Sequence, residues 1–192
     1  MIFGDEPPLL EGEWVRLEPL RADHAQGLYN RGKVAADWAY LPRACFVDLA
    51  DTRQWIEEAV STPGQIPFAL VETAKGRAVG STRYLNIRKE HRSVEIGWTW
   101  IGRDWQRTGV NTEAKLLLLT HAFERLGCVR VEFKCDLRNE RSQQALERIG
   151  ARREGVLRSH MIVQGGHVRD SVYYSIIEAE WPKLKKRLQK LK

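Results

Sequence analysis

The junction at residues 105–115 constrains this chain more than any other segment. It reads Trp-Gln-Arg-Thr-Gly-Val-Asn-Thr-Glu-Ala-Lys and joins an apolar, strand-like run at 94–101 to an apolar, helix-like run at 116–126. A glycine-containing turn between a strand and a helix leaves unpaired N–H groups at the positive end of the helix dipole, which favours phosphate binding. Gly109 lacks a Cβ, so the backbone there could approach a ligand closely. The junction predicts a cofactor or substrate that carries phosphates.

Length and composition indicate one folded domain, expected over residues 1–192. No apolar run approaches the roughly 20 residues of a membrane helix. The N-terminus lacks the basic start and apolar stretch of a secretion signal, so we expect a cytoplasmic protein without membrane contact. The three cysteines form no Cys-x-x-Cys pair, so we expect reduced thiols and neither a disulfide framework nor a metal site.

The positive net charge is concentrated in the C-terminal segment. Residues 181–192 contain six of the 31 Lys and Arg residues and none of the 25 acidic residues, so the rest of the chain is balanced. Trp181, Leu184 and Leu188 fall on one stripe of a helix expected at about 180–192. We favour an amphipathic helix packed on the domain over a nucleic-acid or ribosome contact. The same helix, or an edge strand, could also form a homodimer.

Hydrophobic periodicity and turn residues predict seven strands and five helices. The expected strands are 14–20, 67–72, 78–87, 93–101, 129–135, 155–163 and 167–177, and the expected helices are 24–30, 51–62, 111–126, 140–149 and 180–192. Three consecutive strands on short turns imply antiparallel pairing, whereas the strand–helix–strand unit at 93–135 implies a parallel crossover. The fold class is therefore α+β, a single domain with a mixed, mostly antiparallel seven-stranded sheet.

The alternation of residues in the strand at 93–101 and the cap of the helix at 140–149 predict which way their side chains point. In the strand at 93–101, Val94, Ile96, Trp98 and Trp100 are expected on one face, with Ser93, Glu95, Gly97 and Thr99 on the other. Asn139 is expected to cap the helix at 140–149. Ser142 lies on the inward stripe of that helix with Ala145, Leu146 and Ile149.

The order of elements and several motifs resemble the GCN5-related N-acetyltransferase (GNAT) superfamily, and most of all its ribosomal-protein N-terminal acetyltransferase branch. Residues 106–111 match the family pattern Gln/Arg-x-x-Gly-x-Gly/Ala at the first four positions. Asn139-x-x-Ser142, followed by Ala145-Leu146-x-x-Ile149-Gly150-Ala151, matches a second motif, and residues 153–158 and 170–175 also look like this branch. Asn111 departs from the pattern, and its side chain could crowd a diphosphate or cap the helix, of which we favour the cap.

The resemblance implies a sheet with helices on both faces and a splay between its fourth and fifth strands, where acetyl-CoA would bind as acyl donor. Backbone N–H groups around residues 107–112 would hold the diphosphate, and Arg103, Arg107 or Arg141 would add charge. The pantetheine arm would lie along the strand edge at 98–101. The complete expected cofactor site is Trp98, Thr99, Trp100, Ile101, Gln106, Arg107, Thr108, Gly109, Val110, Asn111, Thr112, Asn139, Arg141 and Ser142.

The chemistry of amine acetylation assigns further expected roles. Ser142 is the candidate proton donor to the leaving thiolate, against an alternative role at the helix start. Glu95 is the candidate general base and could also contact the acceptor, with Glu154 as the alternative base. Asp170 would orient loops or the acceptor amine. Trp38 and Tyr40 would line the acceptor pocket, although core packing is an equal alternative. Cys135 as a nucleophile is disfavoured, because direct transfer needs no thiol.

The sequence thus predicts an acetyl-CoA-dependent N-acetyltransferase that acts on a primary amine by direct attack. The acceptor could be a protein N-terminus, an aminoacyl compound or a small amine, including an antibiotic. The alternative is a non-catalytic acyl-CoA-binding or regulatory module on the same fold.

Overall fold

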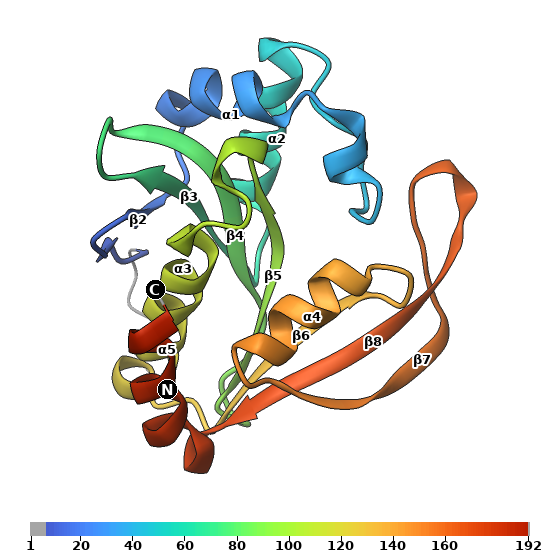
Figure 1. Cartoon of the computed structure of the whole chain (residues 1–192). Coiled ribbons are helices and arrows are strands. Elements are labelled where there is room, and N and C mark those ends of the chain that lie inside the picture. Colours follow the sequence, from blue (N-terminus) through green and yellow to red (C-terminus); the bar gives the residue numbers. More distant parts are fainter. Residues whose placement is uncertain (1–6, 192) are drawn as a thin grey trace.

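The computed structural model describes residues 7–191. Residues 1–6 and 192, which the expected domain and C-terminal helix included, lie outside the described residues. The strands form one eight-stranded sheet in the order β1-β2-β3-β4-β5-β6-β8-β7 (Figure 1). These strands are β1 (Leu10–Glu11), β2 (Val15–Pro19), β3 (Ile66–Glu72), β4 (Arg77–Arg88), β5 (Ser93–Ile101), β6 (Arg130–Asp136), β7 (Arg152–Ile162) and β8 (Val168–Ile177).

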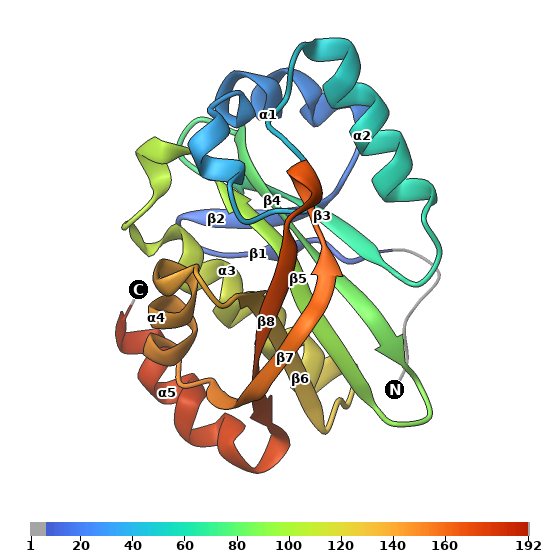
Figure 2. The same cartoon turned by 90° about the vertical axis from the view of Figure 1, so that its right-hand side faces the viewer.

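Helices cover both faces of the sheet, as predicted (Figures 1 and 2). The helices are α1 (Ala25–Gly32), α2 (Leu49–Ser61), α3 (Gly109–Thr120), α4 (Glu140–Arg148) and α5 (Trp181–Leu191). Helices α1 and α2 bury one cluster that contains Leu28, Trp55 and Ile56. The other cluster contains Leu118 of α3, Leu146 of α4 and Leu188 of α5. The α+β class and mixed sheet are confirmed.

The predicted strand count of seven is too low by one. Strand β1 has only two residues, which pair antiparallel with Arg16 and Leu17 of β2. Two residues cannot display an alternating pattern, so the sequence carried no signal for this strand.

Helix α3 starts two residues before its predicted start at Asn111. Thr108 is the cap, and its hydroxyl accepts a hydrogen bond from the N–H of Val110 at 3.3 Å. Asn111 therefore does not cap this helix, contrary to the sequence interpretation. Its side chain is left available for another contact.

Strands β5 and β6 separate after a short parallel segment. Residues 93–95 pair with residues 130–132, and no pairing between the two strands follows in the part of the chain that is described. Strand β5 nevertheless continues to Ile101, and β6 continues to Asp136 (Figure 1). The predicted splay is confirmed, and Glu95 occupies the last paired position of β5.

A bulge in β5 makes the predicted alternation wrong beyond Gly97. Gly97 lies opposite Arg83, and Trp100 lies opposite Ser81, so three steps along β5 match two along β4. Trp98 is the extra residue and has a positive φ of 51°. The α1–α2 cluster therefore includes Trp100, while Val94, Ile96 and Ile101 belong to the α3 side.

The stack of Arg83 on Trp98 shows that the Trp98 indole points toward α2. The Arg83 guanidinium lies 4.5 Å from the centre of that ring and 5.1 Å from the ring of Trp55 in α2. Trp98 thus faces α2 and not the core that holds Val94. Thr99 turns the opposite way and hydrogen-bonds Lys115 of α3.

The C-terminal helix α5 packs on the domain as predicted. Trp181 stacks on Phe123 with 5.3 Å between ring centres, and its indole N–H donates to Glu124 at 2.7 Å. Leu188 is fully buried. Between residues 7 and 191, the structure contains no helix with the length and apolar character needed to span a bilayer.

Candidate functional site

A cleft of about 740 Å³ opens where β5 and β6 separate. Strand β5 lines one side, and β6 with the start of α4 lines the other. The junction after β5 forms one end, and residues 37–42 of the α1–α2 connection close over it. The residues that line the cleft include Tyr40, Glu95, Trp98, Thr99, Trp100, Ile101, Gln106, Arg107, Thr108, Asn111, Lys115, Lys134, Cys135, Asp136, Asn139, Arg141, Ser142 and Arg169.

The junction presents unused hydrogen-bond donors at the N-terminus of α3. Within residues 7–191, the backbone N–H groups of Arg107, Thr108 and Gly109 donate to no protein acceptor. The Oδ1 atom of Asn111 is also buried without a donor partner and lines the cleft. Free N–H groups at a helix N-terminus fit a diphosphate, and the Asn111 oxygen fits an N–H or O–H of the same ligand.

Gly109 has a packing role that the sequence did not predict. A Cβ on Gly109 would lie 1.4 Å from the indole ring of Trp14, far inside contact distance. The glycine is thus required for packing of the segment before β2. The sequence did not reveal this contact because Trp14 is distant along the chain, and close approach of a ligand to Gly109 stays a prediction.

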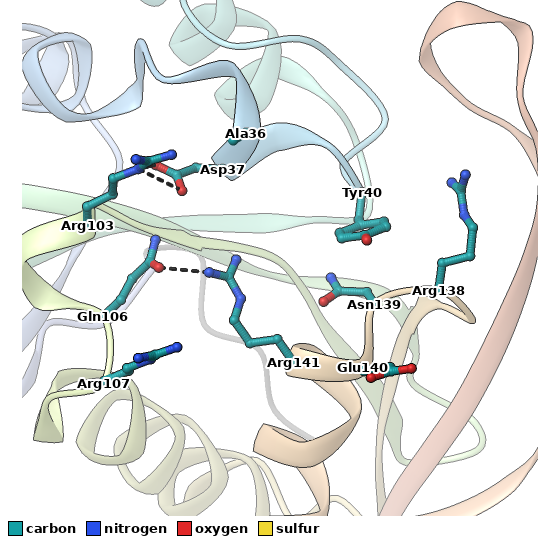
Figure 3. Close-up of a pocket in the computed structure, with 10 residues that line it drawn as sticks. All are labelled: Ala36, Asp37, Tyr40, Arg103, Gln106, Arg107, Arg138, Asn139, Glu140 and Arg141. Atoms are coloured by element: carbon teal, nitrogen blue, oxygen red, sulfur yellow. Dashed lines mark hydrogen bonds and ion pairs between the residues drawn. The ribbon is translucent and has the colours of Figure 1, made fainter.

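Four arginines surround a second cavity of about 640 Å³ that adjoins the first (Figure 3). Arg103 pairs with Asp37 at 3.0 Å, and Arg141 donates to the Oε1 atom of Gln106 at 2.8 Å. Arg107 and Arg141 extend toward the same open space in Figure 3. The fourth arginine, Arg138, was not singled out from the sequence. The cluster gives this end of the cleft a positive potential.

The start of α4 places Ser142 on the cleft wall. Asn139 caps the helix as predicted, because its Oδ1 accepts from the Ser142 N–H at 3.1 Å. Burial raises the pKa of the Cys135 thiol, and the nearby Ser142 side chain lowers it by a smaller amount. A raised pKa keeps Cys135 protonated and makes it a poor nucleophile. Ser142 is the better candidate for chemistry.

Glu95 lies where the two strands part, with its carboxylate in the cleft wall. It is only 1% exposed and accepts hydrogen bonds from Asn86 at 2.7 Å and from Lys134 at 3.3 Å. A buried carboxylate with two donors is held in one orientation. A fixed orientation suits a general base, which must lie within hydrogen-bonding distance of the substrate proton that it accepts.

Three other predicted site residues lie away from the cleft. Glu154 pairs with Arg130, which holds the pKa of its carboxyl at about 2, a poor value for a base. Asp170 accepts from the Ser159 N–H at 2.6 Å and so orders β7, consistent with its expected loop-orienting role. Trp38 is fully buried between Phe46 and Trp100, which favours core packing over acceptor binding.

The other predicted positions divide between the cleft and the core. Tyr40 lines the cleft. Val110 and Thr112 of α3 are buried, and Thr112 accepts a hydrogen bond from Arg148 at 3.0 Å. Their backbone remains at the junction, but their side chains do not line the cleft in the described chain.

Two buried cations in the cleft wall were missed from the sequence. Lys115 is 5% exposed, and its ammonium donates to the Thr99 hydroxyl at 2.8 Å. Arg169 of β8 is 4% exposed. Both sit in otherwise ordinary helix and strand patterns, so no local signal distinguishes them from solvated charges.

The Lys115 ammonium predicts a stability change above neutral pH. Burial lowers its pKa to about 7, whereas an unfolded lysine has a pKa of about 10.4. Between pH 7 and pH 9 the unfolded chain holds a proton that the folded chain has released. The free energy of unfolding should therefore rise with pH, by about 1.4 kcal/mol per pH unit, relative to Lys115→Met. Urea unfolding at several pH values measures this difference. If the free energies of unfolding of the two proteins changed equally between pH 7 and pH 9, the assignment to Lys115 would be wrong.

Comparison with known proteins agrees with this geometry. The model of the acetyltransferase (GNAT) domain matches residues 15–152. The chain is 32% identical to the Bacillus subtilis protein "Uncharacterized N-acetyltransferase YoaA", over 89% of this chain and 97% of that protein. A B. subtilis protein named "Putative ribosomal N-acetyltransferase YdaF" is 38% identical, but the match covers only 55% of this chain and 57% of that protein.

A solved structure shares the whole arrangement. A GCN5-related N-acetyltransferase from Brucella melitensis superimposes with a TM-score of 0.92 at 32% identity, over 96% of this chain and 85% of that one. The family match and this likeness confirm the predicted resemblance. The chain belongs to the GNAT family and is an N-acetyltransferase.

Proposed function

We propose that this enzyme takes its acyl group from acetyl-CoA and transfers it to a primary amine by direct attack. The observation that carries the proposal is the set of free N–H groups at 107–109, beside the arginine cluster and the open edge of β5. These groups would bind the diphosphate and the other phosphate of the coenzyme. The unpaired edge of β5 would hold the pantetheine arm by backbone hydrogen bonds.

The residues at the inner part of the cleft supply the proton transfers. Glu95 would take a proton from the acceptor ammonium, directly or through water, so that the amine lone pair can attack the thioester carbonyl. A C–N bond forms, and N–H groups on the unpaired edge of β5 would stabilise the oxyanion. The C–S bond then breaks, and the Ser142 hydroxyl would donate a proton to the thiolate. The acylated nitrogen would lose its second proton, which would restore the Ser142 hydroxyl through water, and Glu95 would release its own proton to solvent. The products are the N-acetyl amide and CoA.

The test measures donor binding and turnover separately. Calorimetric titration with CoA should show binding that weakens as salt increases, since charged contacts to phosphate are screened. Release of free thiol from acetyl-CoA should then depend on an added amine, from a panel of small amines, aminoacyl compounds and peptides. Ser142→Ala should lower turnover more than CoA affinity. CoA binding without turnover on any acceptor would indicate the non-catalytic module, and loss of all CoA binding would refute the proposal.

One relative, YdaF, is named a putative ribosomal N-acetyltransferase. We therefore include peptides that reproduce ribosomal-protein N-termini in the acceptor panel. Acetylation of these peptides in preference to small amines would assign this chain the same class of acceptor.

A further inference from the structure

Arg169 is a buried cation without a partner. It lies on β8, is 4% exposed and lines the cleft. Its guanidinium makes no hydrogen bond or ion pair with any residue in the described range 7–191, and its Nε atom is buried without an acceptor. Burial lowers the pKa of this guanidinium, but arginine remains charged near neutral pH.

The carboxylates near Arg169 are bound to other groups. Asp136 accepts from the Nε and Nη2 atoms of Arg138 at 3.0 and 2.7 Å. Glu95 accepts from Asn86 and Lys134. These carboxylates act on Arg169 through space, but neither contacts it. Arg138 and Lys134 thus already pair with these two carboxylates, and Arg169 has no carboxylate of its own among the described residues.

An unpaired buried charge is costly for the fold, because desolvation is not offset by a partner. A purely structural Arg169 would be expected to pair with a carboxylate or with backbone carbonyls. Its planar fork of donors matches a carboxylate in bidentate geometry. The missing partner is therefore expected on a molecule that enters the cleft.

We propose that Arg169 binds a carboxylate of the acceptor, so that the preferred acceptor is an amine that also carries a carboxylate. This inference rests on the proposed function, because Glu95 must receive the proton of the same molecule. Lys134 donates to Glu95 and lies on β6, directly beside Tyr173 of β8. Arg169 and Tyr173 are four residues apart on β8, which places them on the same face. The acceptor would lie between Glu95 and Arg169.

The carboxylate could come from a free α-amino acid or from an acidic residue of a peptide. Matched pairs separate these sources: α-amino acids against their α-amides, and N-terminal Ala-Asp peptides against Ala-Asn peptides. A charged hydrogen-bond pair contributes about 1.5–3 kcal/mol, which corresponds to a preference of about 10- to 150-fold in kcat/KM. We expect that preference in one of the two pairs.

Arg169→Met should remove the preference by raising KM for the carboxylate acceptor, with little change for its neutral partner or for CoA affinity. Arg169→Lys should retain part of it. Arg158→Met is the matched control, because Arg158 is exposed on the adjacent strand β7 and should leave the preference intact. Thermal unfolding should show that Arg169→Met is at least as stable as the wild type, whereas loss of stability would indicate a structural arginine.

Acceptor binding tests the role of Arg169 even if the enzyme shows no turnover. Calorimetric titration of the CoA-loaded protein with each acceptor should show tighter binding of the carboxylate member, and Arg169→Met should abolish the difference. If neither kcat/KM nor binding affinity favoured the carboxylate acceptor, the proposed role of Arg169 would be wrong. The acetyltransferase proposal would be unaffected. Absence of turnover with a carboxylate preference in binding would instead count against the proposed catalysis alone.

Discussion

Glu95→Gln is expected to lower kcat by about 100-fold or more at pH 7. General bases commonly contribute 10²- to 10⁴-fold, and a glutamine in the same position can hydrogen-bond but cannot take up a proton. Glu95 is buried at the last paired position of β5, and Asn86 and Lys134 fix its carboxylate. CoA affinity should change little, because the phosphate-binding junction follows the other end of β5. Steady-state kinetics with the best acceptor measure the first effect, and calorimetry measures the second.

The pH profile separates loss of a base from general damage. As pH approaches the pKa of the acceptor amine, more of the amine is already neutral, so the deficit of Glu95→Gln should shrink. Glu154→Gln is the matched control, since Glu154 pairs with Arg130 outside the cleft and should retain a near-normal rate. A near-normal rate for Glu95→Gln at pH 7 would remove Glu95 from the mechanism. A large deficit in Glu154→Gln would transfer the role to that residue.

The parts of the site that were predicted correctly depend on local sequence signals. A helix N-terminus after a strand can be recognised within a dozen residues, so the junction at 105–115 was located correctly. The cap Asn139 was found for the same reason. The splay was instead expected from the family resemblance, because the three pairs that precede it join residues far apart in the sequence. The junction and the cap need no knowledge of distant contacts.

The missed features arise from contacts between distant parts of the chain. The bulge at Trp98 is stabilised by Arg83 and depends on strand register, so strict alternation placed Trp98 and Trp100 on the wrong face. Gly109 is constrained by Trp14, which lies far away in the sequence. Arg169 looks like any strand arginine until its burial and lack of partner are known. The roles of these residues depend on their tertiary contacts, which residue type and local pattern do not reveal.

The segment before β2 is held by another long-range contact, made by Glu113 of α3. The carboxylate is 1% exposed. Its Oε1 accepts from the N–H of Glu13 at 3.0 Å, and its Oε2 accepts from the N–H groups of Trp14 and Val15 at 2.6 and 3.0 Å. One side chain thus satisfies three consecutive backbone donors and joins the sheet edge to α3.

Glu113→Ala should therefore destabilise the fold by about 3–6 kcal/mol. Three donors lose a charged acceptor, each such bond contributing about 1.5–3 kcal/mol, and the donor of Val15 is buried. Glu113→Gln should cost less, since its one oxygen can still accept. The midpoint of urea unfolding at constant slope measures both changes. Glu57→Ala is the control, because Glu57 is exposed on α2 and should change stability by less than about 0.5 kcal/mol. If Glu113→Ala matched that control, the three hydrogen bonds would contribute nothing net, and water would have to replace the carboxylate at these donors.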